Sequence, residues 1–272
     1  MSIPAAAPPW EARVITLVPQ AWPGVLGESL TGRALAEGIW RLTTFPLRDF
    51  GAGPHRKVDD TPAGGGPGLV LRPDVMAAAI RAARDGAPAG APLIHLSPRG
   101  APFTQARAQA LADGPGVVLV CGRFEGLDQR VIEAFGAEEV SLGDFVLTGG
   151  DIAAMALLDA SVRLIPRVLG NRGSVEDESF SHGLLEHPQY TKPAVWEGRA
   201  IPDILLSGDH AGVDAWRRDM AARLTRERRP DLWRAWCATR AMDPVEDQSS
   251  RKARPLRKKP QADEGASDGP DR

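Results

Sequence analysis

Short apolar runs alternate with longer amphipathic runs over the first 165 residues of the chain. The apolar runs, rich in valine, isoleucine and leucine, predict strands at 13–19, 92–98, 116–124 and 138–150. The amphipathic runs predict helices at 29–40, 72–84, 104–112, 128–136 and 151–165. Strands that alternate with helices in this way are typical of a mostly parallel sheet with helices on both faces. We therefore expect an α/β fold.

Further stretches predict the domain organisation. Residues 51–68 hold too much glycine and proline for a regular element and predict a long functional loop. Residues 210–240 predict a basic helical region, and the charged, weakly hydrophobic residues after Met242 predict a disordered tail. The expected division is a domain at 1–169, an interdomain loop at 170–190, a helical domain at 191–242 and a tail at 243–272.

Composition adds a candidate surface and a compartment. The net charge of the 272 residues is −2, but the stretch from Arg217 to Pro260 holds fourteen Lys and Arg against six Asp and Glu, beside Trp216, Trp233 and Trp236. This local excess of positive charge predicts an RNA or DNA surface. The two cysteines form no CxxC pair, and no apolar stretch reaches the length of about 18 residues that a membrane span requires. We therefore expect a reduced cytoplasmic protein with no membrane segment.

Candidate chemistry lies in the loops after the predicted strands, because α/β sheets bind ligands at the carboxyl ends of their strands. The glycine-rich signatures of phosphate binding do not occur, and the histidines lack the spacing of a zinc site, so no metal site is expected. The remaining loops are HLSPRG at 95–100, CGRFEG at 121–126 and LGDFVLTGGD at 142–151. Glycine backbone in such loops can approach a flat heterocycle closely. Taken one at a time, each loop also fits ordinary turn chemistry.

Taken together, these loops resemble a known family. The segments HRKVDDTPAGGGPG, LSPRG, LVCGRFEGLDQRV, SLGDFVLTGGD and LIPRVLGN, with ESF and LLEHPQYTKP after them, are similar in order and spacing to the bacterial tRNA (guanine-N1)-methyltransferase family, over about residues 10 to 240. This family methylates the guanosine just 3′ of the anticodon. The resemblance implies a SPOUT-type parallel sheet that ends in a trefoil knot, followed by a small helical C-terminal domain. It also implies an obligate homodimer with each active site at the subunit interface. A catalytically silent RNA-binding protein of the same fold is the alternative.

By the same resemblance, the strand-end loops bind S-adenosyl-L-methionine. The implied cofactor-binding residues are Leu96, Ser97, Pro98, Gly122, Glu125, Leu142, Gly143, Asp144, Phe145, Val146, Leu147, Gly149 and Gly150. Backbone groups would hold the adenosyl part, and Glu125 would lie near the sulfonium or the amino group. A neutral adenine needs shape and a few hydrogen bonds, which suits loops that lack a cationic phosphate cradle.

Methylation of guanine N1 requires a base, because N1 carries a proton that must leave as the new bond forms. The resemblance assigns Arg163 to the negative charge that develops on O6. The family's catalytic aspartate stands in an Asp-Ser-Phe sequence, whereas this chain reads SVEDESF. Counting places Glu178 at the aspartate position and Asp177 beside it, and glutamate keeps the carboxylate but adds one methylene. Both acids therefore remain candidate bases; apart from the family, acids in a polar loop are commonly solvated surface.

The resemblance also implies residues that handle the tRNA. These are Arg56, Asp59, Asp60, Tyr190 and Lys192. Ala63 stands where many members have tyrosine, which weakens the expectation of base stacking there. The basic C-terminal helices are expected to contact phosphates of the anticodon stem-loop, although alone they also fit a solvated charged face. Stimulation by Mg²⁺ is implied by the family, but no ligand pattern in the sequence indicates a site for it.

Overall fold

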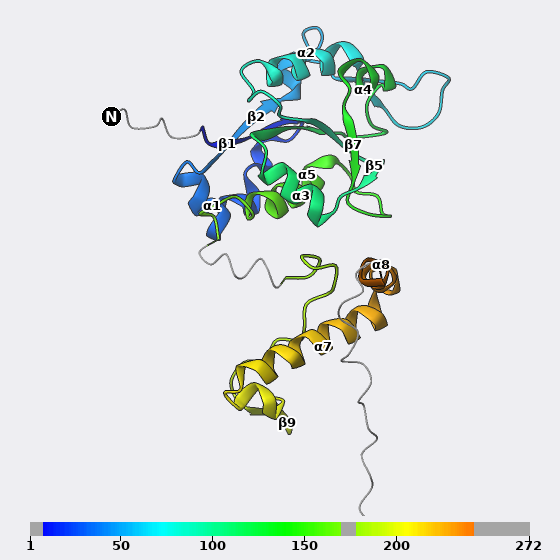
Figure 1. Ribbon diagram of the computed structural model, residues 1–272. Helices are drawn as coiled ribbons and strands as arrows, with labels where there is room; N and C mark the ends of the chain where they lie inside the picture. The colour runs from blue at the N-terminus through cyan, green and yellow to red at the C-terminus, as the bar shows by residue number, and fades with distance from the viewer. Residues whose placement is uncertain (1–7, 170–177, 242–272) are drawn as a thin grey trace, which may run out of the picture. The chain divides into compact units, whose positions relative to one another are not determined.

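The computed structural model describes residues 8–169 and 178–241 of the chain (Figure 1). The chain divides into two compact units, Met1–Ser181 and His182–Arg272. The boundary between them lies within the stretch 170–190, which the sequence predicts to be the interdomain loop. None of the helices in the described part of the chain is long and apolar enough to cross a lipid bilayer.

The first unit is built on a five-stranded sheet in the order β2-β1-β6-β5-β7. The strands are β1 (Trp10–Thr16), β2 (Trp40–Pro46), β5 (Leu93–Pro102), β6 (Gly116–Cys121) and β7 (Glu138–Ser141). Every neighbouring pair is parallel. The central strand β6 is buried along its whole length, as its uninterrupted apolar sequence GVVLVC predicts for a strand covered on both faces. The prediction of a parallel α/β sheet is confirmed.

Helices cover both faces of this sheet (Figure 1). One face packs against α1 (Ser29–Ala36), α3 (Gln105–Ala112) and α5 (Gly150–Val162), and the other against α2 (Pro73–Arg84) and α4 (Gln129–Phe135). Alternate residues of β6 enter the two cores, since successive side chains of a strand point to opposite faces. Leu119 lies in the first core with Ile94 and Leu157, and Val118 lies in the second with Ile80.

The helices begin and end where local chemistry predicts. Proline begins α2, and the Thr104 hydroxyl accepts a hydrogen bond from the Arg107 amide, 3.2 Å away, at the start of α3. The Asp128 carboxylate caps α4 in the same way, accepting from the Arg130 amide at 3.0 Å. Helix α4 ends at Gly136 in the left-handed conformation, as its terminal glycine predicts.

Several segments of the first unit differ from the prediction. Strand β1 lies at 10–16 rather than 13–19, and β5 continues to Pro102 rather than ending at residue 98. Strand β2 was not predicted, because it is an edge strand of mixed polar and apolar residues, and the helical pattern before it stops at Ala36 rather than continuing to Trp40. Strand β7 ends at Ser141, because Gly143 with φ of 152° turns the chain away. The glycine-rich loop also contains a short strand, β3 (Asp59–Asp60), which pairs antiparallel with β4 (Val70–Leu71). Single-turn 3-10 helices lie at η1 (Pro19–Ala21), η2 (Gly24–Gly27) and η3 (Leu47–Phe50).

The second unit is mainly helical. It contains the two-stranded ribbon β8 (Val195–Trp196) and β9 (Arg199–Ala200), the single turn η4 (Asp203–Leu206), and the helices α7 (His210–Arg228) and α8 (Pro230–Ala241). The predicted basic helical region is divided after α7, because Pro230 lacks the amide hydrogen that a continuing helix would need. The buried Thr225 hydroxyl donates to the Ala221 carbonyl at 2.7 Å and accepts from the Leu185 amide at 2.8 Å, which ties the entering chain to α7.

Candidate active site

Residues 95–99 of β5, where its pairing with β7 shifts in register, and the loops after β6 and β7 line a cavity of about 290 Å³. The predicted cofactor-binding residues that line it are Leu96, Ser97, Pro98, Gly122, Glu125, Leu142, Phe145, Val146, Leu147, Gly149 and Gly150. Gly143 and Asp144 belong to the same loop but are not among the lining residues. Gly143 instead shapes the turn: its amide donates to the Ser141 hydroxyl at 3.1 Å, and its carbonyl accepts from the Phe145 amide at 2.9 Å.

Glycine backbone forms one wall of the cavity. The Gly150 amide donates to the Gly122 carbonyl at 2.8 Å, and Gly149 forms an antiparallel bridge with Arg123, so two loops are joined side by side. A Cβ atom at Gly122 would lie 2.8 Å from Cε1 of His95, and one at Gly150 would lie 2.9 Å from Cα of Cys121. These two positions therefore exclude side chains, and the wall presents backbone to whatever the cavity holds.

The cavity also has lining residues that the sequence analysis did not select. They are His95, Arg99, Arg123, Phe124, Gly126, Val140, Ser141, Thr148 and Ala153. His95 is 3% exposed, and its Nδ1 lies 3.4 Å from the Val120 carbonyl oxygen. Burial lowers the pKa of His95 below its usual value, which favours a neutral imidazole. His95, Arg99 and Arg123 all stand inside the quoted loops HLSPRG and CGRFEG, so their position beside the selected residues was the available signal.

The two described candidates for catalysis pair with each other. Arg163, directly after α5, donates from Nη1 and Nη2 to Oε2 and Oε1 of Glu178, at 2.7 and 2.5 Å. Both side chains are partly buried. The Arg163 hydrogen bonds hold the pKa of Glu178 below its usual value, and the same contacts raise the pKa of Arg163. Glu178 is therefore an ionised, oriented carboxylate; Asp177, the other candidate base, lies outside the described residues.

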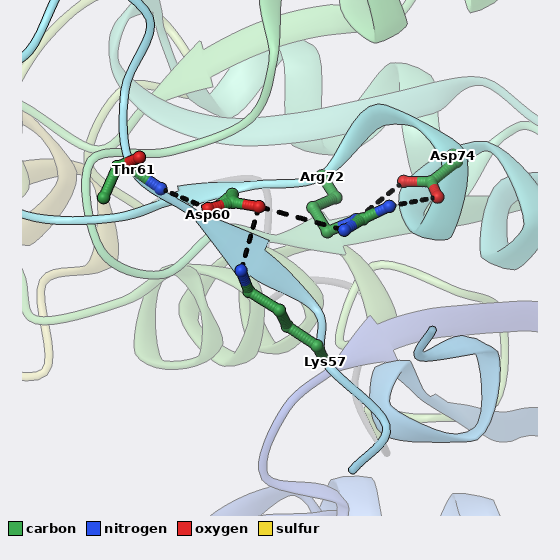
Figure 2. A network of polar contacts seen from close by, with 5 residues as sticks. All are labelled: Lys57, Asp60, Thr61, Arg72 and Asp74. Atoms are coloured by element: carbon green, nitrogen blue, oxygen red, sulfur yellow. Dashed lines mark hydrogen bonds and ion pairs between the residues drawn. The ribbon is translucent and has the colours of Figure 1, made fainter. Parts of the chain in front are cut away.

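Asp60, one of the predicted substrate residues of the glycine-rich loop, lies in a charged network (Figure 2). Asp60 contacts Nζ of Lys57 at 2.9 Å and a guanidinium nitrogen of Arg72 at 3.8 Å. Arg72 in turn donates twice to the carboxylate of Asp74, at 3.0 and 2.8 Å. The Lys57 hydrogen bond is the main cause that lowers the pKa of Asp60. These contacts link the loop to the start of α2.

Backbone hydrogen bonds join the same loop to the rim of the cavity. The Glu125 amide donates to the Leu69 carbonyl at 2.9 Å, and the Leu71 amide donates to the Gly126 carbonyl at 2.9 Å. Asp59 pairs with Leu71 in the short β3–β4 ribbon, and Arg56 contacts Asp49 at 2.9 Å. The structure therefore brings the loop that carries Arg56, Asp59 and Asp60 next to the cavity loop that carries Glu125.

Tyr190 and Lys192 line a separate cavity of about 300 Å³ within the second unit. The ring of Trp216 lies beside them, with its centroid 6.0 Å from that of Tyr190 and 6.2 Å from that of His187. Arg217 also lines this cavity. A lining that combines aromatic rings with cationic side chains is chemistry that suits single-stranded nucleic acid.

Comparison with known proteins gives a consistent identity. Residues 11–235 match the family described as tRNA (Guanine-1)-methyltransferase TrmD. The tRNA (guanine-N(1)-)-methyltransferase of Cereibacter sphaeroides KD131 is 63% identical over 241 residues, which cover 88% of this chain and 97% of the relative. That of Ruegeria pomeroyi is 64% identical over 231 residues, 85% of this chain and 95% of the relative. That of Brucella ovis is 58% identical over 231 residues, 85% of this chain and 94% of the relative. With a match over most of its length and a cavity at the carboxyl end of its parallel sheet, the chain belongs to the tRNA (guanine-1)-methyltransferase TrmD family.

Proposed function

We propose that this protein transfers a methyl group from S-adenosyl-L-methionine to N1 of the guanosine just 3′ of the anticodon in tRNA. Membership of the family supports the reaction. The glycine-walled cavity is the observation that carries the choice of an enzyme over a silent RNA-binding protein, since RNA binding alone does not require it.

The wall of the cavity fits an adenosyl group. Its glycine positions leave backbone amides and carbonyls exposed to a flat ring, and Leu96, Leu142 and Leu147 supply apolar surface. S-adenosyl-L-methionine supplies an electrophilic methyl group on a sulfonium. Glu125 places a carboxylate in the lining, where it favours a positively charged ligand. In this proposal these residues, with Ser97 and Pro98, hold the methyl donor.

The Arg163–Glu178 pair suits the edge of guanine. Guanine presents an N1–H donor beside the O6 acceptor, and a carboxylate beside a guanidinium is complementary to both. In our proposal the base enters the pair, so that N1–H donates to Glu178 and O6 accepts from Arg163. Loss of one arginine hydrogen bond raises the basicity of Glu178 as the N1 proton approaches it. Glu178 then takes that proton while Arg163 stabilises the negative charge on O6.

A homodimer would bring the two parts of the site together. Neither Arg163 nor Glu178 is among the residues that line the cavity of their own chain. Apolar side chains near the cavity are also unusually exposed, with Phe145 at 54%, Val146 at 81% and Ile152 at 62%. Such a patch is typical of a surface that a partner covers. We propose that the cavity of one chain works with the Arg163–Glu178 pair of the other.

Mixing two differently disabled chains tests this arrangement. A heterodimer of a Gly122→Val chain and a Glu178→Gln chain would contain one fully native site if each site is shared between subunits, and about half of the wild-type activity is then expected. Tandem-tag purification before the methylation assay verifies the heterodimer. Each homodimer serves as the inactive control. Activity no higher than in the homodimers would show that each chain builds its own site.

Gly122→Val should weaken methyl-donor binding by about 10- to 100-fold, the scale of a forced overpacking of 1–3 kcal/mol. The new side chain meets the buried ring of His95, which itself lines the cavity and would have to shift. Titration calorimetry with S-adenosyl-L-methionine measures the effect. Gly114→Val is the matched control, because its Cβ lies 3.3 Å from the nearest atom and Gly114 does not line the cavity. Equal affinities for the two variants would contradict the assignment of the wall.

The remaining expectations are proposed on the same resemblance. We infer that the second unit contacts the anticodon stem-loop through Tyr190, Lys192 and the basic face of its helices, and that Arg56, Asp59 and Asp60 act near the target base. We also propose the trefoil knot, a cytoplasmic location and stimulation by Mg²⁺. Chelation with EDTA followed by Mg²⁺ titration tests the last of these.

One assay tests the main proposal. Purified protein is incubated with unmodified tRNA transcript and labelled S-adenosyl-L-methionine, and the digested nucleosides are identified by mass spectrometry. We expect N1-methylguanosine at the position 3′ of the anticodon, and none from a transcript with adenosine there. Cofactor binding without transfer to tRNA would favour a different acceptor, and neither binding nor transfer would favour the silent RNA-binding protein.

A further inference from the structure

Asp151 is a buried carboxylate in the first turn of α5, and it has no part in the proposed methyl transfer. It is 5% exposed. Its Oδ1 accepts hydrogen bonds from the Thr16 hydroxyl at 2.5 Å and from Nε1 of Trp22 at 3.1 Å. The positive end of the helix dipole favours a carboxylate at this place. The other oxygen, Oδ2, lies 3.4 Å from Nη2 of Arg123.

Arg123 connects this buried carboxylate to the cavity wall. It lines the cavity and forms the backbone bridge to Gly149. Its side chain lies directly on Gly149, where an added Cβ would be 2.5 Å from Nε and 2.6 Å from Cδ. The guanidinium therefore packs against the same glycine backbone that faces the cavity, with the Asp151 carboxylate behind it.

The Arg123–Asp151 pair is incompletely hydrogen-bonded. Its arrangement therefore depends on both charges being present. Among the described residues, Arg123 Nε and Asp151 Oδ2 are buried polar atoms without a hydrogen-bond partner. The Arg123 side chain is 28% exposed, so it has a route to solvent, whereas Asp151 does not. Attraction to Asp151 is thus the interaction that favours the inward position of the guanidinium over a solvated one.

We infer that Asp151 is a positioning residue for the methyl-donor cavity: it holds Arg123 on Gly149 and compensates the charge of Arg123, so that a cationic ligand does not meet an uncompensated guanidinium there. This inference rests on the proposed function, because it takes S-adenosyl-L-methionine as the ligand. The ligand carries a sulfonium, an ammonium and a carboxylate, so its net charge is positive. Its demethylated product, S-adenosylhomocysteine, has the same shape apart from the methyl group and no net charge.

The comparison of these two ligands separates charge from structure. Loosening of the wall weakens both alike, whereas an uncompensated guanidinium weakens only the cationic one. Unit charges roughly 10 Å apart, at an effective dielectric constant of about 20, change affinity by about tenfold. For Asp151→Asn we expect the ratio of the dissociation constants, S-adenosyl-L-methionine over S-adenosylhomocysteine, to rise by about this factor.

Calorimetric titration of the full chain with each ligand measures the ratio, with circular dichroism as the folding check. Arg123→Gln should change the ratio in the opposite direction, because the buried carboxylate then stands alone. The double variant Asp151→Asn/Arg123→Gln removes both charges and should bring the ratio back close to the wild-type value. If Asp151→Asn does not fold, Arg123→Gln and the double variant carry the test.

Two control variants match the change. Thr16→Val removes one hydrogen bond to Asp151 without altering charge, and it should lower the melting temperature but leave the ratio unchanged. Asp113→Asn makes the same chemical substitution at an exposed position at the end of α3, outside the cavity lining, and should alter neither.

The outcomes distinguish the two proposals. A ratio that stays constant in Asp151→Asn and in Arg123→Gln, with both ligands bound by the wild-type chain, overturns the positioning role and leaves the proposed function standing. A wild-type chain that binds neither ligand overturns the proposed function itself. Equal weakening of both ligands in Asp151→Asn would assign Asp151 a structural role only.

Discussion

Replacing Glu178 by glutamine is expected to slow methylation by about 10²- to 10⁴-fold, the usual cost of removing a positioned base. Glutamine keeps the shape of the side chain and can still hydrogen-bond to Arg163, but it cannot accept the N1 proton. Binding of S-adenosyl-L-methionine should be unchanged, because Glu178 does not line the cavity. Single-turnover methylation with saturating tRNA and cofactor measures the chemical step.

Asp177→Asn is the matched control for this experiment. Arg163 holds Glu178, whereas Asp177 stands one position earlier in the sequence, where the resemblance places no base. We expect Asp177→Asn to change the rate by less than about tenfold, well below the cost of a lost base. Loss of activity in Asp177→Asn, with Glu178→Gln still active, would show that Asp177 rather than Glu178 is the base. If both variants stay active, the base lies elsewhere.

Arg163→Gln is expected to reduce the rate by about 10²- to 10³-fold, as for loss of one donor to a developing oxyanion. The Arg163→Gln substitution should also move the acid limb of the pH–rate profile. Arg163 lowers the pKa of Glu178, so in the native protein the carboxylate stays ionised to lower pH. Without Arg163 that pKa returns toward its usual value, and the rate should begin to fall at a higher pH.

Single-turnover rates from roughly pH 4, near the ordinary pKa of a carboxyl group, up to roughly pH 8 test this shift. Arg130→Gln is the control, because Arg130 makes similar paired contacts with Asp128 on the surface, away from the cavity lining. An Arg163→Gln profile with a lower rate but an unmoved acid limb would mean that Arg163 acts on the substrate without tuning Glu178.

The features predicted from the sequence are those written in local patterns. The buried strand β6 and the flanking helices follow from apolar periodicity. Gly136 marks the end of α4 in the sequence. The edge strand β2 was missed because four of its seven residues, Arg41, Thr43, Thr44 and Pro46, belong to neither core, so its pattern matches no single template. The loops of the site were predicted because they contain glycine and follow the predicted strands.

Contacts between distant segments could not be predicted in the same way. The pairing of Gly149 with Arg123, and of Asp151 with Thr16, depends on how β1, β6 and α5 are placed in three dimensions. Nothing in the sequence around Asp151 distinguishes it from an acid that caps a helix. The cofactor-binding roles of Gly143 and Asp144 stay predictions: the motif marks their loop, and the two residues are not among those that line the cavity of the single chain.

Because β6 is buried on both faces, the pattern of its side chains does not by itself set its register against the neighbouring strands. Its residues are apolar on both sides, so sliding the strand by one residue would exchange the two cores without exposing apolar surface. The glycine that begins the strand, Gly116, and the glycine directly after it, Gly122, remove that ambiguity. A side chain at Gly116 would collide with the Glu11 carbonyl, and one at Gly122 with His95. A shift of one position would move Val117 to the place of Gly116, or Cys121 to the place of Gly122. The two glycines therefore fix the position of the strand. Gly122 at the same time leaves its backbone exposed to the cavity.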